Sequence, residues 1–139
     1  LVASRAYLAR AGAPVKLGDL ARHALCVFTS SGDARAARLE VRSSRGLVVI
    51  DRAPRLVCTS QVALRQCLID GAGIGMIPWY LARHAIDRGA LVEVLETHRA
   101  PSATLQLLTA RTQLTSAVRA FVATLTEAFR AHRPWVRAR

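Results

Sequence analysis

The chain has 139 residues, 52% of them hydrophobic, and a formal net charge of +11 at pH 7. This length suits one domain, or one domain with part of another, and the composition allows a core of ordinary size. No apolar run is long enough to span a membrane and the N-terminus lacks a signal-peptide pattern, so a cytoplasmic protein without membrane contact is expected.

The positive charge comes from 20 basic residues, of which only Lys16 is a lysine. These residues are scattered along the whole chain, and aromatic residues make up only 5% of it. Neither an aromatic stacking surface nor a recognition helix for DNA is indicated. The favoured interpretation is an arginine-rich bias on solvated faces, ahead of direct contact with nucleic acid.

The first part of the chain predicts short elements separated by glycine, proline and polar residues. The expected elements are a strand at residues 1–3, a helix capped by Ser4 and running through Ala11, a helical turn at 17–21, a strand at 24–29, a polar loop at 30–36, a hairpin of strands 39–42 and 47–50, and a strand at 55–59.

The most informative stretch follows. Ser60 lies where an N-cap is needed and Gly71 supplies a left-handed exit, which predicts a helix between them. Residues 74–77 are too few and too apolar for a surface helix, so a strand covered on both faces is expected. Pro78 then opens another helix. The stretch therefore predicts an α/β unit with almost no connecting residues.

Gly71, Gly73 and Gly75 alternate in a way that resembles a dinucleotide-binding fingerprint. That fingerprint follows a strand and opens a helix, so that the pyrophosphate rests on the helix N-terminus. Here the glycines follow a helix and open a strand. A structural role in stopping the helix and allowing close helix-to-strand packing is therefore favoured.

The last part of the chain predicts a further helix-and-strand series. The expected elements are a helix at 79–87 closed by Gly89, a strand at 90–95, a polar connection at 96–102, a strand at 104–109, a helix at 116–131 behind a Thr115 cap, and a basic tail at 132–139. The last helix carries one apolar stripe, which is typical of a core-facing helix. Its members are Val118, Phe121, Val122, Leu125 and Phe129.

Catalytic and metal-binding motifs are not evident. The 4 histidines lie far apart and none has a cysteine or carboxylate at metal-ligand spacing. No nucleophile elbow, phosphate loop or catalytic cysteine signature occurs, so neither an enzyme nor a cofactor is expected. Cys26, Cys58 and Cys67 suit buried thiols in a reducing compartment. A bridge between Cys58, at a strand end, and Cys67, two turns into a helix, looks geometrically poor.

The order of these elements resembles the effector-binding region of LysR-type transcriptional regulators. The resemblance covers nearly the whole chain, and its motifs are weak singly but specific in this order. It rests on residues 1–14, Leu17 to Leu20 before the strand at Leu25, Thr59-Ser60 with Ala63-Leu64, Gly71 to Pro78, Ala90 to Leu95, and Ser116 to Phe129.

The resemblance implies an α/β fold of the type II periplasmic-binding-protein architecture, with a small molecule held between two lobes. Residues 1–102 would form the second lobe, with the hinge at residues 1–3. Residues 103–131 would supply the returning strand and final helix of the first lobe, ahead of the basic tail. The helix-turn-helix that binds DNA, and the first half of the first lobe, would lie upstream of Leu1.

Candidate ligand contacts follow from a general rule for α/β sheets. Ligands bind beyond the carboxyl ends of strands, often at a helix N-terminus whose amides favour an anion. By resemblance, two such places would face the cleft. They comprise Phe28, Thr29, Ser30 and Ser31 after one strand, and Thr59 and Ser60 before the next helix. The alternative is that Ser60 is only a cap and that Ser30 to Gly32 form only a turn, although one residue can do both.

The function implied by the resemblance is effector sensing. A small, anionic effector would bridge the lobes, change their closure and bias the arrangement of a homodimer or tetramer on DNA. Peroxide sensing is not expected, because Ser30, Ser31 and Asp33 occupy the loop in which peroxide-sensing members carry cysteines. A periplasmic-type solute-binding protein fragment is the alternative with the same fold.

Overall fold

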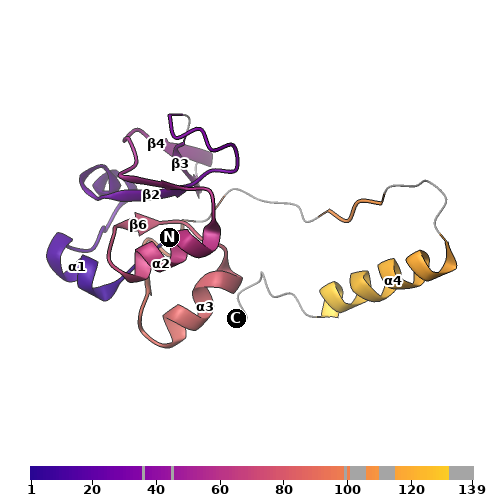
Figure 1. Ribbon diagram of the computed structural model, residues 1–139. Helices are drawn as coiled ribbons and strands as arrows, with labels where there is room; N and C mark the ends of the chain where they lie inside the picture. The colour runs from indigo at the N-terminus through magenta and orange to yellow at the C-terminus, as the bar shows by residue number, and fades with distance from the viewer. Residues whose placement is uncertain (36, 45, 99, 101–105, 110–114, 132–139) are drawn as a thin grey trace. The chain divides into compact units, whose positions relative to one another are not determined.

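The computed structural model describes residues 1–35, 37–44, 46–98, 100, 106–109 and 115–131. The chain divides into two compact units, Leu1–Pro101 and Ser102–Arg139. In chain order the elements are β1 (Val2–Ala3), α1 (Arg5–Ala11), the 3-10 helix η1 (Leu17–Arg22), β2 (Leu25–Phe28), β3 (Leu39–Ser43), β4 (Gly46–Ile50), β5 (Leu56–Cys58), α2 (Gln61–Ile69), β6 (Ile74–Gly75), α3 (Trp79–Asp87), β7 (Val92–Glu93) and α4 (Ser116–Ala131) (Figure 1).

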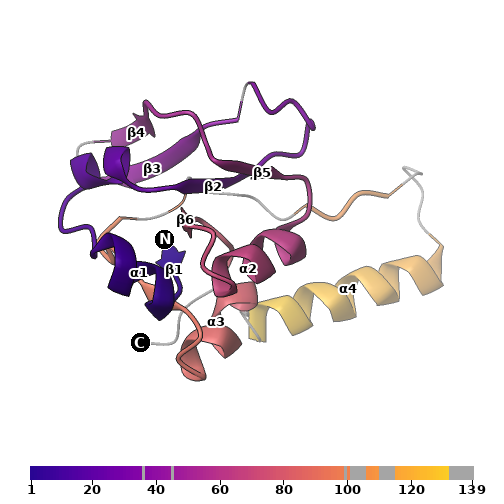
Figure 2. The same ribbon diagram turned by 60° about the vertical axis from the view of Figure 1, so that its left-hand side comes forward.

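The first unit contains a mixed five-stranded sheet in the order β5-β2-β6-β1-β7 (Figure 2). Strand β2 is parallel to both β5 and β6, whereas β1 is antiparallel to both β6 and β7. The register pairs Phe28 with Cys58 and Leu25 with Ile74. Strands β3 and β4 form a separate antiparallel hairpin. The α/β fold class expected from the sequence is confirmed.

Two clusters of buried apolar residues hold the first unit together. One joins α1, η1, β2 and the hairpin, and its fully buried members include Leu20, Leu25 and Val41. The other joins α2 and α3 to the sheet, with Leu64 and Leu68 at 0% exposure. All residues of both clusters belong to the first unit.

The predicted helices and their caps are confirmed. The Ser4 hydroxyl accepts a hydrogen bond from the Tyr7 amide at 3.2 Å, which caps α1. Gly71 has a φ of +84° after α2 and Gly89 a φ of +70° after α3, so both supply left-handed exits. Thr115 accepts a hydrogen bond from the Val118 amide at 3.4 Å and begins α4. Among the helices of the described residues, none is long and apolar enough to cross a membrane.

The close packing expected of the glycines is also confirmed. A Cβ atom at Gly75 would lie 2.7 Å from the Cys26 carbonyl oxygen and 3.1 Å from the Leu68 side chain on α2. A Cβ atom at Gly73 would lie 2.2 Å from the Ala24 carbonyl oxygen. These glycines therefore let α2 and β2 approach the backbone at Gly73 and in β6, as the structural interpretation of the glycines predicted.

Strands β2 and β5 are one residue shorter at each end than predicted, and β6 and β7 are also shorter than predicted. Strand β6 covers Ile74–Gly75 rather than 74–77, because its pairing with β1 and with β2 ends at Gly75 on both sides. Strand β7 covers Val92–Glu93 rather than 90–95. The amides of residues 90 and 91 instead donate to the Ala85 carbonyl, at 2.9 and 3.1 Å, and so complete the end of α3.

The strand expected at 104–109 is wrong for its described part, because residues 106–109 adopt no strand and pair with none of the described strands. A β-strand needs a partner for its backbone groups, and an alternating apolar pattern alone does not supply one. The remainder of that prediction, residues 104 and 105, and the predicted tail at 132–139 lie outside the described residues.

Candidate functional site

Strands β2 and β5 end side by side because they are parallel neighbours. The pairing of Phe28 with Cys58 continues one residue further, where the Thr29 amide donates to the Cys58 carbonyl at 3.0 Å. The residues that follow each strand, Thr29 and Thr59, therefore lie at the same edge of the sheet. The topology therefore brings to one edge the two groups of candidate residues that were predicted from separate parts of the sequence.

The loop after β2 turns tightly toward Thr59. The hydroxyls of Thr29 and Ser31 are hydrogen-bonded at 3.0 Å, and the Asp33 amide donates to the Ser31 hydroxyl at 3.2 Å. Gly32 has a φ of +73°, and a Cβ atom there would lie 4.0 Å from the Thr59 methyl group. Ser31 thus takes part in a turn, as the simpler interpretation held, while the loop as a whole lies against Thr59.

The start of α2 supplies the second part of the site. The Ser60 hydroxyl accepts from the Ala63 amide at 3.3 Å and its carbonyl from the Leu64 amide at 2.9 Å. The cap predicted at Ser60 is confirmed. Within the described part of the chain, the amides of Gln61 and Val62 have no acceptor, and the first turn of α2 holds no acidic residue. Such a helix start favours an anion.

Exposure separates the six candidate residues into two groups. Ser30, Ser31, Thr59 and Ser60 are exposed, whereas Phe28 and Thr29 are half-buried. Four hydroxyl-bearing residues therefore border solvent at one edge of the sheet. Hydroxyl groups donate and accept hydrogen bonds, so this edge offers both to a ligand.

Two polar residues on α2, Gln61 and Arg65, were not predicted as site residues from the sequence. The Gln61 Oε1 and Arg65 Nε atoms are buried and have no hydrogen-bond partner among the described residues. Buried polar atoms without partners cost free energy, so such atoms are uncommon. Gln61 and Arg65 are four positions apart, hence neighbours on one side of the helix. The four-residue spacing of Gln61 and Arg65 was the signal in the sequence that the two side chains are neighbours, but nothing in the sequence indicated that their polar atoms are buried.

Three free cysteines lie near the site. Burial raises the pKa of Cys26 to about 11, and Cys67 and Cys58 add to the shift. Burial also raises the pKa of Cys58, and the nearby Cys67 thiol raises it further. The expectation of buried thiols holds for Cys26, whereas Cys58 and Cys67 are half-buried. No three metal-binding side chains gather among the residues that the structure describes.

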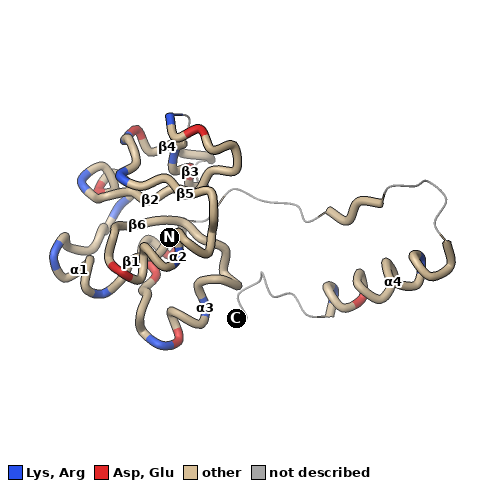
Figure 3. The backbone as a smooth tube through the Cα atoms, in the orientation of Figure 1, with Lys and Arg blue, Asp and Glu red and all other residues tan. Residues whose placement is uncertain are grey.

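The basic residues that the structure describes are distributed over several elements. Figure 3 shows Lys and Arg positions on α1, around the β3–β4 hairpin, and on α3 and α4, with acidic positions among them. The distribution agrees with the interpretation of a general arginine bias on solvated faces. The candidate site therefore depends on hydroxyls and helix amides more than on a cluster of surface charge.

Comparisons with known proteins agree with this architecture. The family model described as the LysR substrate binding domain matches residues 1–130. An uncharacterised HTH-type transcriptional regulator of Escherichia coli (strain K12), YhjC, is 32% identical over 106 residues, which cover 76% of this chain and 36% of YhjC. The chain thus spans about a third of the length of that curated relative.

Solved structures with similar folds come from the same kind of regulator. The regulatory domain of CrgA from Neisseria meningitidis, a LysR-type transcriptional regulator, matches with a TM-score of 0.64 at 22% identity over 91% of this chain and 61% of that one. The full-length Vibrio cholerae virulence activator AphB matches with a TM-score of 0.60 at 26% identity over 70% of this chain and 32% of that one.

The relatives are transcriptional regulators and not enzymes. The periplasmic-binding-protein-like α/β fold, the order of the elements and the family match over residues 1–130 all agree. This chain belongs to the family of LysR substrate-binding domains, the effector-binding part of LysR-type transcriptional regulators.

Proposed function

We propose that this chain senses a small anionic effector at the edge of the sheet where β2 and β5 end. The observation that carries the proposal is the 3.0 Å hydrogen bond from the Thr29 amide to the Cys58 carbonyl. It fixes the loop after β2 beside Thr59 and Ser60. Phe28, Thr29, Ser30, Ser31, Thr59 and Ser60 are the residues proposed to contact the effector.

The anionic character of the effector is inferred from the start of α2. The amides of Gln61 and Val62 have no acceptor among the described residues, and no carboxylate lies in the first turn. The guanidinium of Arg65 lies one turn further along the same helix. Its unpaired Nε atom adds a donor and a positive charge near the helix start.

The proposed mechanism is closure of two lobes around the effector. Residues 1–102, with the hinge at residues 1–3, would supply one lobe, and residues 103–131 would contribute to the other. Closure would change the arrangement of a homo-oligomer in the cytoplasm, and so the DNA binding of an N-terminal helix-turn-helix in the longer regulator. The match to an HTH-type regulator favours this function over a periplasmic solute-binding protein.

A ligand panel on paired variants tests the site. The thermal unfolding midpoint of the chain should rise with at least one member of a panel of small carboxylates and inorganic phosphate, because a ligand that binds only the folded state stabilises it. The double variant Thr59→Val with Ser60→Ala should lose this rise. Its matched control is Thr115→Val with Ser116→Ala, which alters the same pair of residues at the start of α4.

The control variant should keep the full ligand-induced rise. A rise that persists unchanged in the Thr59→Val, Ser60→Ala variant would remove these residues from the site. A midpoint that rises with none of the carboxylates and not with phosphate would contradict the proposed anionic character.

A further inference from the structure

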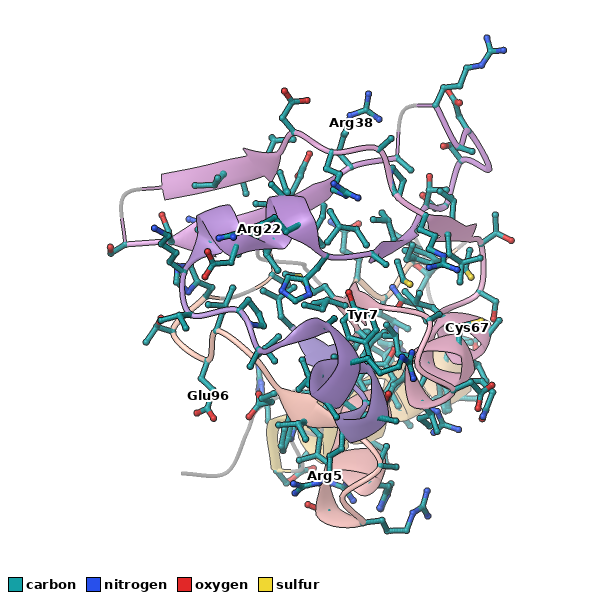
Figure 4. All side chains as sticks on the ribbon, turned by 90° about the vertical axis from the view of Figure 1, so that its left-hand side faces the viewer. Arg5, Tyr7, Arg22, Arg38, Cys67 and Glu96 are labelled. Carbon is teal, nitrogen blue, oxygen red and sulfur yellow. The ribbon has the colours of Figure 1, made fainter. Side chains whose placement is uncertain are left out.

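A buried polar pair joins α1 to the beginning of β2, away from the candidate ligand site. Tyr7 is 7% exposed and His23 is 5% exposed. The Tyr7 hydroxyl lies 3.1 Å from His23 Nδ1, and the two ring centroids are 5.8 Å apart. Figure 4 shows Tyr7 on α1, with Arg22 on the neighbouring η1.

The backbone around the pair favours one assignment of the proton between the Tyr7 oxygen and His23 Nδ1. The Ala24 amide donates to the Tyr7 oxygen at 2.9 Å. The Tyr7 hydroxyl proton is then directed to His23 Nδ1, which requires a neutral imidazole with its own proton on Nε2. A second proton, placed on Nδ1, would face the Tyr7 oxygen and force the hydroxyl proton to turn away from its acceptor.

The surroundings of His23 also oppose a positive charge. Burial lowers the pKa of His23; Asp19 raises it and Arg22 lowers it by their charges. Both of these residues lie on η1. The Asp19 carboxylate accepts hydrogen bonds from the Val15 and Lys16 amides and from Arg22, and among the described residues no carboxylate is hydrogen-bonded to the imidazole.

A change in the hydrogen bonding of the Tyr7–His23 pair would affect the beginning of β2 and, through Ala24, strand β6. His23 and Ala24 lead directly into β2, and the Ala24 carbonyl accepts from the Ile74 amide of β6 at 2.8 Å. Helix α1 follows the short strand β1, and its other polar attachment across the fold is a hydrogen bond from Arg10 to the Gly71 carbonyl at 3.3 Å. Among the described residues, Tyr7 and Arg10 therefore provide the polar side-chain links between α1 and the rest of the first unit.

We propose that Tyr7, His23 and the Ala24 amide form an acid-sensitive latch between α1 and β2, which opens when His23 takes up a proton. At pH values above the pKa of His23, the Tyr7 hydroxyl donates to His23 Nδ1 and its oxygen accepts a hydrogen bond from the Ala24 amide. Once the imidazole is charged, this arrangement is lost and the end of β2 is released from α1. The latch does not depend on the ligand site proposed above.

Amide exchange measured with the imidazole titration tests the latch on the unaltered chain. His23 should titrate below 6.5 in NMR spectra, since burial opposes its charge. The protection factor of the Ala24 amide should fall about tenfold between pH 7.5 and 5, with the titration of His23. The Ile74 amide, which is bonded to Ala24 but not to the latch, should change less.

Two pairs of variants separate the latch from general loss of structure. Tyr7→Phe should leave the Ala24 amide weakly protected at both pH values, whereas Tyr80→Phe, at a half-exposed tyrosine on α3, should behave like the unaltered chain. His23→Gln should remove the pH dependence of Ala24 protection and His84→Gln should retain it. An Ala24 protection factor that is constant across the His23 titration, or a His23 that titrates at or above 6.5, would overturn the proposal.

Discussion

At the scale of single residues, position 73 shows most clearly that only glycine fits. Its φ is not in the left-handed region, so the requirement is one of space alone. A Cβ atom would lie 2.2 Å from the Ala24 carbonyl oxygen and 3.1 Å from the Cys26 sulfur. Gly73→Ala must displace backbone, and we expect it to lower the free energy of unfolding by about 3 kcal/mol.

Chemical denaturation of Gly73→Ala and of Gly18→Ala measures this effect. A Cβ atom at Gly18 would meet nothing within 4 Å. That variant should change the free energy of unfolding by about 1 kcal/mol or less, toward higher stability, because it restricts the unfolded chain. Equal losses in both variants would show that the contact with Ala24 is not the cause.

The three thiols should differ in reactivity. The pKa of Cys26 is raised from 9.0 to about 11, first by burial and then by Cys67 and Cys58. Two pKa units reduce the thiolate fraction about 100-fold, and the thiolate is the reacting form. In the folded chain near pH 8, iodoacetamide should therefore modify Cys26 slowest, as measured by peptide mass spectrometry. In denaturant the three rates should converge; a fast Cys26 in the folded state would contradict its burial.

At the scale of elements, η1 depends on one half-buried carboxylate, that of Asp19. Hydrogen bonds from the Lys16 and Val15 amides lower the pKa of Asp19, with a further contribution from Arg22. The folded state therefore binds the Asp19 proton less readily than the unfolded state. The stability that Asp19 contributes is fully present above pH 3.8 and is lost as pH falls through the lowered pKa.

Asp19→Ala should consequently lower the thermal unfolding midpoint at neutral pH, and the difference from the unaltered chain should shrink as pH falls below 3.8. Asp87→Ala is the control, because no described residue donates a hydrogen bond to that carboxylate on α3. A difference that stays constant through the acid range would mean that the Asp19 charge is not responsible.

Helices were predictable from this sequence to a degree that strands were not. Caps and exits are local: Ser4, Ser60, Gly71 and Gly89 each determine a helix end through their own side chain or φ. Strand lengths depend on partners elsewhere in the chain. The two residues of β1 limit the pairing of β7, and β6 pairs with β1 and β2 only as far as Gly75; no feature of residues 74–77 or 90–95 reveals these limits.

At the scale of the whole molecule, part of the candidate site was predictable from the sequence and part of it became evident only in the folded structure. The rule for carboxyl ends of strands selected Phe28 to Ser31 and Thr59 with Ser60, and the parallel pairing of β2 with β5 brings these two groups to one edge. Gln61 and Arg65 could not be found in this way. Their distinguishing property is burial without partners, which exists only once α2 is packed.

The location of the buried core leads to a prediction about the thermal stability of a shortened chain. Among the residues that the structure describes, all members of both buried clusters belong to Leu1–Pro101. A chain ending at Pro101 should therefore unfold cooperatively with a midpoint close to that of a chain ending at Ala131, because burial of apolar surface is the main stabilising contribution. Circular dichroism at increasing temperature measures both. A shortened chain without a cooperative transition would show that residues after Pro101 are needed to complete the core, and that the first unit is not an independent folding unit.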